Sequence, residues 1–185
     1  MAGLFTANML FRAGWDVVIL ERAPTPLSGR GTGIVTHAGM LALLRRAGVT
    51  TDASLGVTLT HRLSFDKQGR VTAQTAFSQI LMGWSRLHAL LVDALPVHCY
   101  QLNRGVAEVV FGTATARARA ICHDGETVEA DVLIGADGVR SLVRGAMLPN
   151  EHLETAPYIA WRGLVLQGNL SASAQAQLGD AFVVV

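Results

Sequence analysis

Gly3 and Glu21 are the first pair of residues whose types and spacing suit binding chemistry, and they stand 18 positions apart. Gly3 lies near the head of an expected helix, and Glu21 ends the strand expected after it. In a nucleotide-binding βαβ unit, glycine lets the helix start approach a pyrophosphate, and a carboxylate after the second strand accepts hydrogen bonds from a ribose diol. The pair alone does not decide against a helix-packing glycine and an ordinary surface glutamate.

A second candidate is the segment Gly135–Arg144, which reads GADGVRSLVR. It follows an apolar run expected to form a buried strand, so Asp137 would stand at the carboxyl edge of a parallel sheet, where such folds bind ligands. Its carboxylate could accept a hydrogen bond from a ribityl or ribose hydroxyl. The alternative is a simple Asp-Gly turn with a surface helix after it.

His37 comes shortly after the extended piece Ile34-Val35, and it is a candidate for proton transfer because histidine titrates near neutral pH. The alternative, a surface histidine at the start of a helix, stays open. His98-Cys99 and Cys122-His123 suggest a metal site only weakly, since neighbouring strand residues point to opposite faces. We therefore expect no metal.

The elements that must position these residues begin with a helix over residues 1–13, which Gly14 ends as a left-handed C-cap. Residues 16–22, DVVILER, are typical of a strand buried in a parallel sheet. The strand that should precede the helix is absent. The apolar face of the helix consists of Leu4, Ala7 and Phe11.

The middle of the chain changes from helical to alternating patterns. A Pro/Gly-rich loop covers residues 24–33, and no Gly-Lys-Ser/Thr follows it as a phosphate loop would require. We expect helices over residues 38–47 and 84–94, a hairpin over 56–77 that turns at 67–70, and strands over 106–111, 115–123 and 126–130.

The last third returns to apolar runs. Residues 132–135 are expected to form another buried strand, which leads into the glycine turn and a short helix with Arg140 and Arg144. After Pro149 the chain is expected to be extended, and Phe182–Val185 is expected to lie in a strand. The class is α/β.

Composition excludes several classes of protein. Half of the 185 residues are hydrophobic, 16% are charged and the formal net charge is +1, so nothing favours disorder, nucleic acid or an anionic membrane as partner. No run of about 18 apolar residues predicts a membrane span, and no basic head predicts a signal peptide. Two cysteines make no disulfide framework, which fits the cytoplasm.

The Gly135–Arg144 segment resembles the second sequence fingerprint of the class A FAD-dependent monooxygenases, the aromatic hydroxylase family, and Glu21-Arg22 suits the first unit of that fold. Gly29–Val35 and Tyr158–Val165 resemble the branch that includes 2,6-dihydroxypyridine 3-hydroxylase. Trp84–His88 sits where that branch carries a Trp-x-x-Leu-Tyr pattern, from which His88 departs.

The resemblance implies a Rossmann-like FAD-binding domain with a parallel sheet, its first strand missing, plus the start of an antiparallel-sheet substrate domain. It implies residues 1–53 and 81–152 as the FAD-binding domain, 54–80 as a hairpin of the substrate-side sheet, and 153–185 as the start of the substrate domain. Trp161 and Arg162 could shape the pocket there. The implied cofactor-binding residues are Gly3, Leu4, Glu21, Arg22, Gly33, Val106, Asp137 and Gly138.

The implied reaction uses FAD, NADH or NADPH and molecular oxygen to hydroxylate an electron-rich aromatic or hydroxypyridine-type ring through a flavin hydroperoxide. His37 would help to deprotonate a ring hydroxyl, and the partner is a small aromatic molecule, with a homodimer allowed. Two alternatives stay open: a non-catalytic truncated remnant, and a related flavin reductase or epoxidase. Because the family pattern extends past both ends, we expect a fragment that aggregates easily and binds FAD weakly.

Overall fold

The computed structural model describes residues 1–27, 29, 31–159, 165–179 and 181–184. The chain divides into two units. The first contains residues 1–28, 46–49 and 88–159, and the second contains residues 29–45, 50–87 and 160–185. The helices α2 (Ala38–Arg46) and α3 (Trp84–Asp93) contribute residues to both units.

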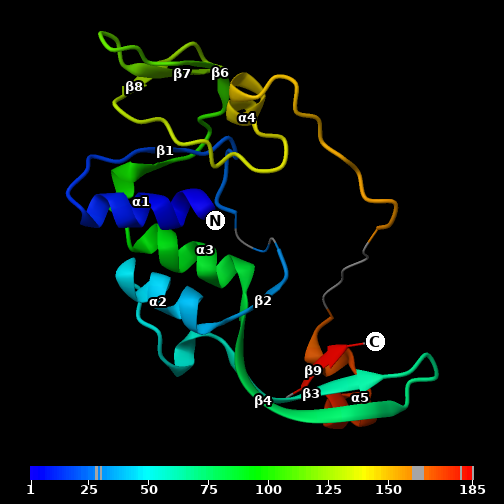
Figure 1. Cartoon of the computed structure of the whole chain (residues 1–185). Coiled ribbons are helices and arrows are strands. Elements are labelled where there is room, and N and C mark those ends of the chain that lie inside the picture. Colours follow the sequence, from blue (N-terminus) through cyan, green and yellow to red (C-terminus); the bar gives the residue numbers. More distant parts are fainter. Residues whose placement is uncertain (28, 30, 160–164, 180, 185) are drawn as a thin grey trace. The chain divides into compact units, whose positions relative to one another are not determined.

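The first unit begins with α1 (Ala2–Arg12), which lies beside the C-terminal half of α3 (Figure 1). The side chain of Asn8 joins them, because its Nδ2 donates to the carbonyl oxygens of Leu4 and Leu91, each at 2.9 Å. Gly14 has φ +87°, which confirms the expected left-handed stop. Leu4 and Ala7 are buried as expected, whereas Phe11 is 38% exposed, so the buried face is narrower than expected.

Two sheets complete the first unit. In the smaller one, β1 (Ile19–Leu20) pairs in parallel with β5 (Tyr100–Gln101). In the other, β6 (Val106–Val110), β7 (Ala118–Cys122) and β8 (Thr127–Ala130) form an antiparallel sheet in that order, and β7 and β8 meet at a turn where Gly125 has φ +87°. A short 3-10 helix (Val97–Cys99) precedes β5, and α4 (Leu142–Met147) follows the sheets.

The second unit is built on a four-stranded sheet in the order β2 (Gly33–Val35), β4 (Val71–Gly83), β3 (Val57–Phe65) and β9 (Ala181–Val184). The β3–β4 hairpin is the long arm that reaches the 66–70 turn in Figure 1. Strand β9 is parallel to β3, with His61 opposite Ala181. Two 3-10 helices (Ala53–Leu55 and Gln167–Asn169) and α5 (Ala172–Leu178) connect these strands.

The cores of the two units are mainly aliphatic. In the first unit the buried apolar side chains include Leu4, Ala7, Val49, Leu91, Leu95, Cys99, Ala120 and Cys122. In the second unit they include Met40, Leu44, Leu55, Leu59, Leu63, Met82 and Leu87. None of the described helices has the length and hydropathy needed to span a lipid bilayer.

Most of the expected elements are confirmed, including the α/β class, the long hairpin and the strand at residues 182–184. The predicted strand at 132–135 is wrong, since those residues are neither helix nor strand and Val132 and Ile134 are 55% and 48% exposed. The predicted strand at 16–22 contracts to the two residues of β1. A buried parallel strand needs neighbours on both edges, and in the described chain β1 has β5 alone while 132–135 pairs with no strand.

Candidate functional site

The start of α1 is an open helix end. Its N-cap residue, Met1, makes no side-chain capping bond, so the first backbone N–H groups of the helix are not capped by a side chain. A Cβ atom on Gly3 would lie 3.1 Å from the Cβ of Ala136, so glycine permits this turn to approach the Gly135–Gly138 segment closely. The structure therefore brings two of the predicted regions together. Leu4 is buried, and its side chain belongs to the core.

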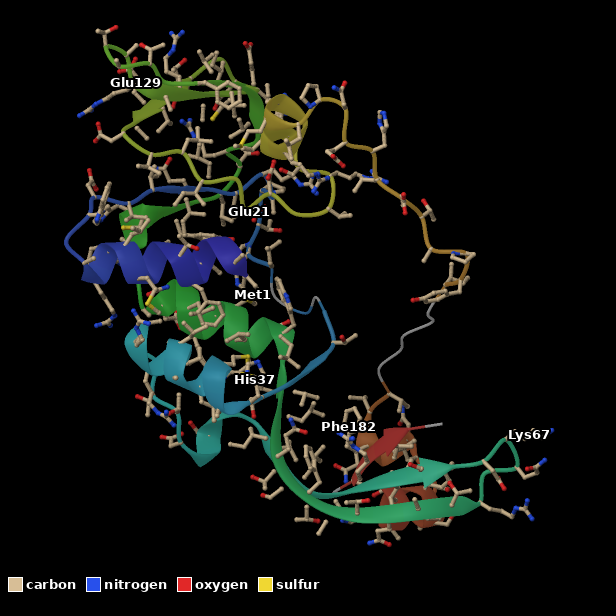
Figure 2. The ribbon with its side chains drawn as sticks, in the orientation of Figure 1. Met1, Glu21, His37, Lys67, Glu129 and Phe182 are labelled. Atoms are coloured by element: carbon tan, nitrogen blue, oxygen red, sulfur yellow. The ribbon has the colours of Figure 1, made fainter. Side chains whose placement is uncertain are left out.

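Glu21 directly follows β1 and is half-buried. Its backbone is fixed on both sides, because its N–H donates to the Gln101 carbonyl at 2.9 Å and its carbonyl accepts from the Arg104 N–H at 2.8 Å. Its Oε1 accepts from the Ala23 N–H at 2.9 Å. The other carboxylate oxygen accepts no hydrogen bond from the described residues, so it is available to a diol. Figure 2 labels Glu21 in this position.

Arg104 is a residue that the sequence reasoning missed. Its guanidinium contacts the carboxylates of Asp124, at 3.2 Å, and Glu126, and its side chain is 16% exposed. The backbone of Arg104 holds Glu21, so this ion pair connects the β7–β8 turn to the loop that carries the carboxylate. Arginine followed twenty residues later by Asp-Gly-Glu is too common a pattern to predict such a contact.

Two further predicted residues lie beside this loop. Val106 begins β6, is half-buried and pairs with Cys122. Arg22 is exposed, and its Cβ lies 3.4 Å from the position that a Cβ on Gly105 would take. Both residues therefore lie near the backbone of Glu21. No described contact gives either of them a ligand-binding role.

Asp137 caps α4. Its Oδ1 accepts from the Ser141 hydroxyl at 2.5 Å, and its Oδ2 accepts from the backbone N–H groups of Leu142 at 2.7 Å and Val143 at 3.3 Å. Burial raises the pKa of Asp137, but these hydrogen bonds outweigh burial and hold the pKa below its ordinary value. Gly138 has φ +85°, which glycine adopts without strain. The carboxylate already orders the segment that faces Gly3.

His88, which departs from the Trp-x-x-Leu-Tyr pattern, lies beside Tyr100. It is buried, its Nε2 lies 3.3 Å from the Tyr100 hydroxyl, and the two rings meet edge to face with centroids 5.8 Å apart. Burial lowers the pKa of His88 and raises that of Tyr100. This pair packs inside the first unit between α3 and β5.

Gly33 and His37 belong to the second unit. Gly33 opens β2 opposite Gly83, and a Cβ on Gly33 would lie 3.3 Å from the Cδ1 of Leu81. His37 precedes α2, as Figure 2 shows, and its Nδ1 accepts from the Met40 N–H at 3.3 Å. In the neutral ring this contact leaves the proton on Nε2.

A cavity of about 470 Å³ lies beside His37. Its wall includes Thr36, Leu41, Phe77, Gln79 and Ile80. This volume falls in the usual range for small-molecule sites, and the polar side chains of Thr36, His37, Ser78 and Gln79 line it together with one aromatic and two aliphatic side chains. It can hold a single aromatic ring.

No group of three or more histidine, cysteine or acidic side chains suitable for a metal occurs among the described residues. Cys99 and Cys122 are buried free thiols. The predicted pocket residues Trp161 and Arg162 lie outside the described residues.

The residues of the first unit fit a dinucleotide. The uncapped start of α1 offers N–H donors to a pyrophosphate, and Gly3 keeps that approach free of a side chain. Glu21 has an unused carboxylate oxygen for ribose hydroxyls, which is the chemistry that an adenosine ribose needs.

Comparison with known proteins agrees with this fit. A family described as "FAD binding domain" matches residues 1–171. The chain is 31% identical to 2,6-dihydroxypyridine 3-monooxygenase of Paenarthrobacter nicotinovorans over 98% of its own length, and 30% identical to 6-hydroxynicotinate 3-monooxygenase of Pseudomonas fluorescens over 89%. The structure of 2,6-dihydroxypyridine-3-hydroxylase from Arthrobacter nicotinovorans superposes with a TM-score of 0.82 and 28% identity over 97% of this chain. The chain spans 45% of each of these three proteins.

Proposed function

Because the chain belongs to this FAD-binding family, whose relatives above are monooxygenases, we propose that it forms part of a FAD-dependent monooxygenase that hydroxylates an electron-rich aromatic or hydroxypyridine-type ring. The proposed reductant is NADH or NADPH. The observation that carries the proposal is the close approach of Gly3 to Ala136, since it joins the open helix end to the Gly-x-Asp-Gly segment within one unit.

The proposed contacts to FAD use groups that the fold leaves available. The N–H groups at the start of α1, at Gly3 and Leu4, would bind the pyrophosphate, and Glu21 would accept from the adenosine ribose. Arg22, Gly33, Val106, Asp137 and Gly138 would line the remainder of the cofactor. When bound, FAD would supply the activation of oxygen that ring hydroxylation requires.

His37 is the proposed catalytic residue, and its orientation defines what it can do. Because Nδ1 accepts from Met40, the neutral ring holds its proton at Nε2 and can donate a hydrogen bond to a ring oxygen of the substrate. To accept a proton from the substrate at Nε2, the His37 ring must hold its own proton at Nδ1, and Nδ1 then no longer accepts from the Met40 N–H. We therefore propose that His37 stabilises the oxygen of a deprotonated ring at least as much as it accepts the proton.

The proposed domain plan assigns residues 1–53 and 81–152 to FAD binding, 54–80 to the hairpin of a substrate-side sheet and 153–185 to the start of the substrate domain. The location of β3, β4 and β9 in one sheet supports the substrate-side assignment. A cytoplasmic location and a homodimer are further proposals, the first of which is supported by two free thiols.

The test is a titration of FAD into the purified chain, followed by flavin fluorescence, and then oxygen uptake with NADH or NADPH in the presence of 2,6-dihydroxypyridine. Saturable FAD binding and substrate-dependent oxygen uptake are the expected results. FAD binding without oxygen uptake would favour the non-catalytic alternative. The absence of any FAD binding would contradict the proposal.

A further inference from the structure

The segment at the end of β5 lies between the Glu21 loop and the β7–β8 turn, and its backbone bonds to both. On one side, the Gln101 carbonyl accepts from the Glu21 N–H at 2.9 Å, and the Arg104 N–H donates to the Glu21 carbonyl at 2.8 Å. On the other side, the Gly105 carbonyl accepts from the His123 N–H at 2.9 Å. Because both backbone groups of Glu21 bond to this segment, the position of the segment sets the position of Glu21.

The same segment packs closely against both neighbours. A Cβ on Gly105 would lie 3.0 Å from the Cδ2 of His123 and 3.4 Å from the Cβ of Arg22, so only glycine fits there without displacing one of them. Asn103 has φ +57°, a left-handed conformation that asparagine tolerates better than most residues, and its N–H donates to the Ala23 carbonyl at 2.9 Å. A shift of the β7–β8 turn is therefore passed on to the Glu21 loop.

The side chain of Arg104 fixes the segment to that turn. Its Nη1 contacts Oδ2 of Asp124 at 3.2 Å and also the carboxylate of Glu126. The other oxygen of Asp124 accepts from the Glu126 N–H at 3.0 Å, so the turn itself holds this carboxylate in place. An ion pair in full solvent is worth little, but Arg104 is only 16% exposed, and removing the partners of a mostly buried cation is costly.

We propose that Arg104 is a positioning residue for cofactor binding, whose ion pairs with Asp124 and Glu126 hold the Glu21 carboxylate where it meets the adenosine ribose of FAD. The proposal rests on the proposed function and deepens it. Arg104 acts through its backbone bond to Glu21, and its guanidinium is engaged by the two carboxylates of the turn. A carboxylate that is held in place before the ligand arrives loses less freedom on binding, which raises affinity.

The test is a double-mutant cycle between Arg104→Met and Glu21→Gln, with FAD affinity measured by flavin fluorescence. Arg104→Met should weaken FAD binding about threefold to tenfold, and by no more than Glu21→Gln does. Adding Glu21→Gln to Arg104→Met should cause little further loss, whereas a merely structural role of Arg104 would make the two losses add. Arg117→Met is the matched control, because it breaks the 3.0 Å ion pair with Asp131 beside the same sheet, and it should leave FAD affinity unchanged.

A second variant keeps Arg104 and removes its partners. The double substitution Asp124→Asn with Glu126→Gln changes two exposed side chains, so it carries the test even if Arg104→Met does not fold. It should weaken FAD binding by a factor similar to that of Arg104→Met. Additive losses in the cycle, or wild-type FAD affinity in this double variant, would overturn the inference.

Hydrogen exchange measured by NMR tests the same contact without the cofactor. Relative to the N–H groups of α3, the N–H groups of Glu21 and Asn103 should exchange at least about fivefold faster in Arg104→Met, and they should not do so in Arg117→Met. Unchanged exchange in Arg104→Met overturns this inference alone. A wild-type chain that binds no FAD overturns the proposed function.

Discussion

At the scale of single residues, Glu21 decides how much of the cofactor affinity comes from one carboxylate. One of its oxygens already accepts from the Ala23 N–H, and the other accepts from none of the described residues. Glu21→Gln keeps an acceptor for Ala23 but removes the charge. A hydrogen bond to a charged group is worth about 1.5–3 kcal/mol, so we expect FAD to bind about tenfold more weakly or worse, as measured by flavin fluorescence titration.

The matched control for this change is Glu129→Gln. Glu129 is an exposed residue of β8, and it is far in sequence from the loop that carries Glu21 (Figure 2). Glu129→Gln alters the net charge of the chain by the same amount, but Glu129 is not a proposed FAD contact, so it should leave FAD affinity unchanged. Equal effects of the two variants would show that Glu21 acts only through net charge and would refute a specific contact with the ribose.

Asp137 predicts a pH dependence with a definite sign. Burial raises the pKa of Asp137, but the hydrogen bonds from Ser141, Leu142 and Val143 have the larger effect. The pKa therefore lies below the ordinary 3.8. Because the folded pKa is the lower one, the cap is fully present above pH 3.8 and is lost as the pH falls through the folded pKa. The amide resonances of Leu142 and Val143 should therefore titrate with a midpoint below 3.8.

Ser141→Ala removes one of those donors and should move the midpoint upward. Ser171→Ala, at the N-cap of α5, removes a comparable cap that involves no carboxylate and should leave the midpoint where it is. A wild-type midpoint at or above 3.8 would contradict the prediction, because it would mean that the three hydrogen bonds do not outweigh burial in solution.

At the scale of elements, Gly31 fixes how the loop before β2 meets α3. It has φ +80°, and a Cβ there would lie 2.5 Å from the Cβ of Trp84. Gly31→Ala should destabilise the second unit by about 2–4 kcal/mol, from a left-handed backbone and from overpacking together. Gly69→Ala has a similar φ, +76°, but open space around it, so it should cost only about 1 kcal/mol. Urea unfolding measures both, and equal losses would contradict the close contact with Trp84.

The elements that sequence predicts well are those whose partners are local. The hairpin at residues 66–70 is encoded by neighbouring residues, since Asp66 binds the backbone N–H groups of Gln68 and Arg70 within its own turn. The apolar run at 132–135 carries an equally clear pattern, yet it forms no strand here. Its pattern reports what a strand would bury, and not whether a neighbour is present to pair with it.

The candidate site divides in the same way. Gly3, Glu21 and Asp137 could be found from sequence because glycine and carboxylate types at fixed spacing carry a chemical meaning. Arg104 could not, because it matters through contacts with a distant segment. It meets Asp124 and Glu126, which lie 20 and 22 positions further along the chain. Arginine is not unusual in a loop, so only the fold distinguishes this residue.

At the scale of the whole chain, the balance between buried and exposed apolar groups is unusual in the first unit. Val132 and Ile134 are exposed within a segment that reads as a buried strand, and Val139, Met147 and Leu148 are exposed in the residues that follow. Exposed apolar side chains gathered in one stretch of the chain favour association with another surface. Half of the residues are hydrophobic, but only part of them lie in the cores of the two units.

The double substitution Val132→Thr with Ile134→Thr tests whether that segment is exposed in solution. If it is, the variant should lose less than about 0.5 kcal/mol of stability and should self-associate less, as seen by light scattering over a concentration series. Val97→Thr is the control, because Val97 is 94% exposed but outside this segment, and it should leave self-association unchanged. A loss of several kcal/mol in the double variant would show instead that these side chains are buried, by the chain itself or by a second copy. A concentration-independent loss would indicate the chain itself, whereas a loss that shrinks on dilution would indicate the copy.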